Sequence, residues 1–229
     1  MEDQRRSISR IIVLALLYVT LVLLIAWRTG PFFYHFAGLR LVTLYSLFQL
    51  SATAFAAFAA SKALGKERTT RLYLNPASRP FYISGWGFLF LAFDEIFSIH
   101  ENLDKLIHFV FSMRVTSWSD HIDDFIVFLY GLIAIFFIKE FIAEFRRRPY
   151  MLSLIGVGMV FFFIMFCMDY ITNNFETFME FVITEFSNGD LVHKCDVGRM
   201  IEDSMKLLGE AFLLSAFAGA LVHIRSKKS

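Results

Sequence analysis

The residues with the clearest capacity for chemistry lie in the stretch FLFLAFDEIFSIHENLDKLIH, residues 88–108. It begins as an apolar run and then carries six ionisable residues that could bind metal or move protons: Asp94, Glu95, His100, Glu101, Asp104 and His108. Asp94, Glu101 and His108 are seven residues apart, so one continuous helix would place them on one face. Ionisable groups inside a membrane span are costly and need a partner, a water-filled cavity or a metal.

Further carboxylates occur in two other apolar regions. Asp169 follows the run MVFFFIMFCM, and the segment IEDSMKLLGE at 201–210 carries Glu202, Asp203 and Glu210 around Lys206. Lys206 is four residues from both glutamates, so it could simply neutralise them on one helix face. Asp203 is seven residues from Glu210.

The surplus of carboxylates over cations predicts shared protons or a bound cation, because several carboxylates cannot all ionise side by side in a low dielectric. Histidine with carboxylates suits Zn²⁺, the divalent metal we expect, whereas an all-carboxylate shell would suit Mn²⁺, Ca²⁺ or Mg²⁺. The candidate ligands are Asp94, His100, Glu101, Asp169 and Asp203. Glu95 or Glu210 is the candidate catalytic base, and the chain has no HExxH motif.

Each of these residues also has a structural interpretation. His100 and Glu101 could mark the water interface, and Asp104 and His108 could be interfacial. The carboxylates inside the spans could form a buried hydrogen-bond network that orders the bundle.

The elements that would position these residues are membrane helices. The chain has 229 residues, of which 57% are hydrophobic, and the apolar residues come in blocks of about 20, long enough to cross a bilayer. We expect an all-α polytopic membrane protein, a six-transmembrane helix bundle forming one domain over residues 1–229. The predicted spans are about 11–27, 39–64, 81–99, 122–138, 151–172 and 201–223. A short amphipathic helix is expected at 173–186, in the last outer loop.

The distribution of basic residues predicts the orientation, because cytoplasmic loops are enriched in Lys and Arg. Most of the 22 basic residues fall on one side if both termini are cytoplasmic, and the other side keeps Arg28, Arg40, Arg114, Lys194 and Arg199. This orientation brings His and carboxylate groups of four spans to the outer layer of a cell membrane, inner or plasma. The net charge of +1 does not indicate a nucleic-acid partner.

Two stripes of small residues predict close helix packing: Ala52, Ala56 and Ala60 in the second span, and Ala211, Ser215 and Gly219 in the last. The two cysteines, Cys167 and Cys195, have no metal-site spacing, and their pairing as a disulfide is left open.

The motifs DEIFSIHE at 94–101 and IEDSMKLLGE at 201–210 resemble those of uncharacterised bacterial multi-span membrane proteins, which bring no established activity. The chain is also similar to alkaline ceramidase-like membrane hydrolases in having His and Asp near one membrane face. Their pattern has a His-x-x-x-His pair in a late span, whereas the last span here has only His223, at the opposite end.

Three functions therefore remain open. The first is a metal-dependent intramembrane hydrolase acting on membrane lipid, with the helix at 173–186 as a lid. The second is a proton- or cation-coupled transporter, because intramembrane acids often mark ion paths. The third is a structural or sensory module whose polar cluster orders the bundle.

Overall fold

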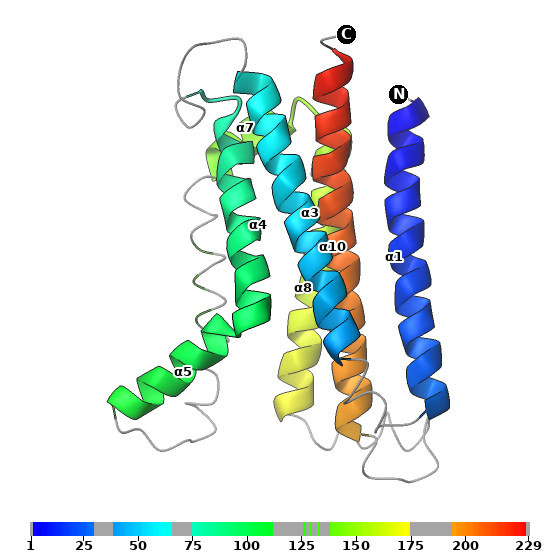
Figure 1. The fold of residues 1–229 in the computed structure, drawn as a ribbon, viewed down its shortest axis with the longest axis vertical. Helices are drawn as coiled ribbons and strands as arrows, with labels where there is room; N and C mark the ends of the chain where they lie inside the picture. The colour runs from blue at the N-terminus through cyan, green and yellow to red at the C-terminus, as the bar shows by residue number, and fades with distance from the viewer. Residues whose placement is uncertain are drawn as a thin grey trace.

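The computed structural model describes residues 2–29, 39–65, 75–111, 138–174 and 194–227, with residues 126, 129 and 132. Regular structure in these ranges is helical, so the predicted all-α class is confirmed (Figure 1). The helices are α1 (Glu2–Thr29), α3 (Leu39–Gly65), α4 (Arg79–Phe97), α5 (Ile99–Val110), α7 (Ile138–Phe145), α8 (Pro149–Asn174) and α10 (Lys194–Ser226).

Three of the described helices are long and apolar enough to cross a membrane. They are Val42–Gly65 in α3, Pro149–Met168 in α8 and Ile201–Ser226 in α10, and α4 with α5 adds a fourth if that bent pair is one span. The protein is therefore a helical membrane protein. The predicted span at 122–138 and the predicted amphipathic helix at 173–186 lie mostly outside the described residues.

The bundle is built around α10, which packs against α8, α3 and α1, while α3 also packs against α4 (Figure 1). The outer helices keep large apolar side chains exposed, such as Leu17 of α1 and Phe163 of α8. In a membrane protein such faces contact lipid at no cost, because lipid tails are as apolar as the side chains.

Small residues allow α3 and α10 to approach closely, as their spacing predicts. Ala56 and Ala60 of α3 and Ala211 and Ser215 of α10 are buried. The core beside them is aromatic: the rings of Phe81, Phe145 and Phe217 pack edge to face, with centroids 5.9 to 6.2 Å apart. This core lies toward the end of the bundle that carries α7.

Glycine permits the contact between α8 and α10. A Cβ added at Gly158 would lie 3.0 Å from the backbone oxygen of Gly209 and 3.4 Å from the Cβ of Phe212. Both neighbours are fixed by their helix, so a larger residue at position 158 must push the two helices apart.

We expect Gly158→Val to destabilise the folded protein by about 2 kcal/mol, the usual cost of overpacking. Gly156→Val is a matched control, because the described structure places nothing within 4 Å of a Cβ at Gly156. Unfolding midpoints in detergent would test the difference. Equal destabilisation by the two substitutions would show that helix propensity, not contact with α10, sets the cost.

The prediction of one continuous helix through residues 88–108 is wrong. The helix breaks at Ser98, which adopts a left-handed conformation with φ 45°, and the Asn102–Val110 part of α5 is bent by 71° from α4 (Figure 1). Asp94 therefore lies on a different helix from Glu101 and His108, and the three do not share one helix face.

Candidate functional site

The centre of the candidate site is the carboxylate of Glu210, in the middle of α10. The side chain is buried, with 2% of its surface exposed, although it lies within a membrane-spanning helix. The hydroxyl of Ser46 on α3, which is fully buried, donates a hydrogen bond to Glu210 Oε1 at 2.7 Å. The contact joins residues 164 positions apart in the sequence.

A second residue of α3 completes the binding of this carboxylate. Gln49 lies almost one turn after Ser46 and is also buried. In the amide orientation that satisfies its neighbours, Gln49 Nε2 donates to Glu210 Oε2 at 3.0 Å and to the Leu207 carbonyl at 3.2 Å. Both oxygens of Glu210 therefore accept hydrogen bonds from uncharged donors on α3, and neither donor cancels its charge.

A cation that interacts with this carboxylate, Lys206, lies one turn away on the same helix. The ammonium of Lys206 forms an ion pair with Glu95 of α4, so the pair links α10 to α4. Lys206 also interacts electrostatically with Glu210 and Asp203. The sequence offered Lys206 as a partner for the glutamates on its own helix, but its direct partner comes from α4.

These residues form one site, which we call the ionic site and define as Ser46, Gln49, Glu95, Asp203, Lys206 and Glu210. It contains three carboxylates and one ammonium. Ion pairs removed from water depend on close charge compensation, because the attraction must offset the loss of hydration. Among the described residues, the site therefore has fewer cations than carboxylates.

Two tyrosines lie beside the ionic site. The rings of Tyr18 on α1 and Tyr45 on α3 stack with their centroids 4.0 Å apart. Tyr45 contacts the Gln49 side chain and interacts electrostatically with Glu210. In the described part of the chain, the buried hydroxyl of Tyr18 has no hydrogen-bond partner. The tyrosines thus connect α1 to the ionic site through aromatic packing.

Asp94 and His100 form a separate pair across the helix break. Asp94 Oδ2 lies 2.7 Å from His100 Nδ1, and Asp94 Oδ1 accepts the backbone N–H of His100 at 3.0 Å. The carboxylate thereby binds one of the unsatisfied N–H groups in the first turn of α5 and fixes the histidine ring. With Nδ1 engaged by a carboxylate, Nε2 is the ring nitrogen left to bind a metal.

The predicted site residues fall into three groups. Glu95, Asp203 and Glu210 belong to the ionic site, and Asp94 and His100 form the pair at the break. The side chains of Glu101 and Asp169 lie outside the described residues.

Among the described side chains, no group of three His, Cys, Asp or Glu is close enough to hold a metal ion. Cys167 has a free thiol, and the side chain of Cys195 is outside the described residues.

Sequence reasoning missed Ser46, Gln49 and Tyr45. A signal was present, because Ser46, Gln49 and Thr53 recur at helical spacing within an apolar span. Polar residues in a span most often satisfy their own backbone, as Thr53 does by donating to the Gln49 carbonyl at 2.7 Å. The sequence does not show that Ser46 and Gln49 instead reach across to α10.

The chain belongs to a protein family defined by a shared domain. Residues 10–220 match the family model described as domain of unknown function DUF8692. No curated protein and no solved structure matches the chain.

Proposed function

We propose that this chain is an ion-coupled membrane protein, a transporter in which Glu210 takes up and releases a proton or another cation. The observation that carries this proposal is the burial of Glu210 within a membrane-spanning helix, with both oxygens bound by neutral donors of α3. Buried ionisable residues in membrane spans often mark ion or proton paths.

Protonation of Glu210 would change how α3 and α10 are joined. The ionised carboxylate only accepts hydrogen bonds, and it accepts from Ser46 and Gln49. A protonated carboxyl group becomes a donor at one oxygen, so the donor facing that oxygen must turn. The Ser46 hydroxyl can rotate, and the Gln49 amide must flip or separate. Proton binding is thereby coupled to the contact between two spans.

The proposed topology has six spans in the inner or plasma membrane of a cell, with both termini in the cytoplasm. It is supported by the distribution of Lys and Arg and by the position of the chain ends, since α1 begins and α10 ends at the same end of the bundle (Figure 1). Glu210 is nine residues from the outer end of the span Ile201–Ser226, or about 14 Å along the helix. A proton would then enter the ionic site from the outer side.

The test is a rapid pH step applied to proteoliposomes on a solid-supported membrane. Wild-type protein is expected to give a transient current when the outer pH changes, because protons enter a site inside the bilayer. A rapid step in Na⁺ or K⁺ concentration at constant pH tests the other cations, and a transient current identifies the one that is coupled. Currents no larger than those of protein-free liposomes for every cation would rule out this function.

A metal-dependent hydrolase acting on membrane lipid is the second candidate, and the Asp94–His100 pair favours it. A carboxylate on one nitrogen of a histidine is the usual support for a histidine that binds zinc through the other nitrogen. His100 would be a ligand, Asp94 its support, and Glu101, Asp169 and Asp203 the candidates for further ligands. A bound Zn²⁺ would lower the pKa of a water molecule, and Glu95 or Glu210 would act as base.

Metal content distinguishes this candidate from the first. If the protein is a metal-dependent hydrolase, purified wild-type protein contains about one zinc or other transition metal ion per chain. Both His100→Ala and Asp94→Ala should then lower the metal content at least about tenfold. Plasma mass spectrometry on detergent-purified protein measures the metal content, with His223→Ala, at the opposite end of the bundle, as the control. A folded protein without metal would remove this candidate in its zinc form.

A further inference from the structure

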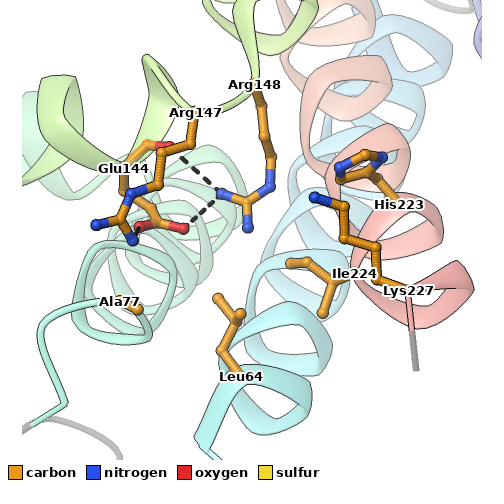
Figure 2. A pocket seen from close by; sticks show the side chains of 8 residues that line it. All are labelled: Leu64, Ala77, Glu144, Arg147, Arg148, His223, Ile224 and Lys227. Carbon is orange, nitrogen blue, oxygen red and sulfur yellow. Dashed lines mark hydrogen bonds and ion pairs between the residues drawn. The ribbon is translucent and has the colours of Figure 1, made fainter.

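A second polar site lies at the opposite end of the bundle from α5. A cavity of about 250 Å³ opens there between α3, α7 and α10. Its polar lining comes from Glu144, Arg147, Arg148, His223 and Lys227. Figure 2 shows Arg148 and Lys227 extending toward each other from opposite sides, with Arg147 beside Glu144. The residues of the ionic site are not among those that line it.

The cavity carries more positive charge than its own carboxylate neutralises. Glu144 is buried and binds both arginines: Arg148 Nη1 lies 2.5 Å from Oε1, and Arg147 Nη1 lies 3.1 Å from Oε2. Each carboxylate oxygen is therefore occupied by one guanidinium. Lys227 adds a third cation from the end of α10, so two positive charges remain uncompensated within the lining.

Arg148 gives this cavity a buried cation, which distinguishes it from an exposed basic surface. Only 8% of the residue is exposed, and its guanidinium lies 5.4 Å from the centre of the Phe81 ring. Among the described residues, its buried Nε has no hydrogen-bond partner. Figure 2 shows the guanidinium projecting into the space between Glu144 and His223. A buried donor without a partner is costly, and a ligand that accepts its hydrogen bond removes that cost.

We propose that this cavity binds a phosphate group, supplied either by the headgroup of an anionic lipid or by a free phosphate ion. Phosphate oxygens match the planar fork of an arginine, and Lys227 would add a point charge. Basic pockets between membrane helices on the cytoplasmic side are suited to lipid headgroups. In the proposed topology the cavity faces the inner leaflet.

Two double variants test this site. One removes two positive charges that line the cavity, and the other removes two positive charges outside it. Arg147→Gln/Lys227→Gln removes two lining cations, both exposed, so folding should be preserved. Arg146→Gln/Arg225→Gln removes two exposed cations at the same end of the bundle that do not line the cavity. The probes are inorganic phosphate, dihexanoyl phosphatidylglycerol and dihexanoyl phosphatidylcholine, added to full-length protein in neutral detergent.

We expect the Kd for the binding probe to rise at least about tenfold in the lining variant and less than about twofold in the matched control. Arg148→Lys keeps the charge but removes the Nε donor, and it should also weaken binding.

Saturation by inorganic phosphate assigns the site to a free phosphate ion, whereas saturation by phosphatidylglycerol alone assigns it to a lipid headgroup. Binding of no probe, equal binding of both lipids, or equal weakening in both double variants would overturn the assignment. The pH-step current should be unchanged in the lining variant, so this site and the ionic site can fail independently.

Discussion

Lys206→Met is expected to destabilise the folded protein by about 2–4 kcal/mol, one of the two largest effects we predict. Lys206 is the direct partner of Glu95 and lies one turn from Glu210. Methionine fills a similar volume but leaves Glu95 without its cation in a mostly buried position. Removing one partner of a buried ion pair is strongly destabilising because the remaining charge is uncompensated.

Stability would be measured by unfolding in detergent, with Lys105→Met on α5 as an exposed control. The double variant Glu95→Gln/Lys206→Met removes both charges and should recover about half or more of the loss. A Lys206→Met protein within about 0.5 kcal/mol of wild type would mean that the Lys206–Glu95 pair does not hold α10 against α4.

Glu210→Gln is expected to abolish the current that follows a pH step while leaving the fold intact. Glutamine has nearly the same shape: its oxygen can still accept from Ser46, and its NH2 group can donate to Gln49 once the Gln49 amide flips to present its own oxygen. It cannot take up a proton at neutral pH. We therefore expect the transient current to fall at least about tenfold, to the level of protein-free liposomes.

The control for this variant is Glu140→Gln at the other end of the bundle, where Glu140 pairs with Arg79 at 3.1 Å and both side chains are partly exposed. Its current should match wild type. Normal current in Glu210→Gln would show that the titrating group lies elsewhere, with Glu95 and Asp203 the next candidates.

The sequence predicted those parts of the fold that depend on local pattern. Apolar blocks and small-residue stripes predicted α3, α8 and α10, and the burial of Ala56, Ala60 and Ala211 confirms the stripes. Charged residues within apolar runs directed attention to Glu95 and Glu210, because a charge in a span is unusual enough to be visible in one sequence.

Contacts between distant segments were not predictable in the same way. Ser46 and Gln49 are ordinary polar residues, and nothing local indicates that they bind a carboxylate on another helix. The break at Ser98 was missed because no glycine or proline marks it. It is held instead by the hydrogen bonds between Asp94 and His100, which form only once the chain has bent.

The basic cavity was missed for a similar reason. In the sequence, the positive-inside rule fully explains the three consecutive arginines at the cytoplasmic end of a span, Arg146, Arg147 and Arg148, and nothing distinguishes one from another. In the folded protein, Arg146 is exposed while Arg148 is buried over Phe81. Burial within a run of identical residues depends on which helix face meets the bundle, and that is a tertiary property.

The most direct measurement is infrared difference spectroscopy of the protein in lipid bilayers during a pH titration, with wild type beside Glu210→Gln. A protonated carboxyl group has a carbonyl stretching band that disappears on ionisation. We expect wild type to show such a band changing reversibly with pH and the Glu210→Gln variant to lack it, with the other bands unchanged. An identical set of carboxyl bands in the two proteins would contradict proton exchange at Glu210.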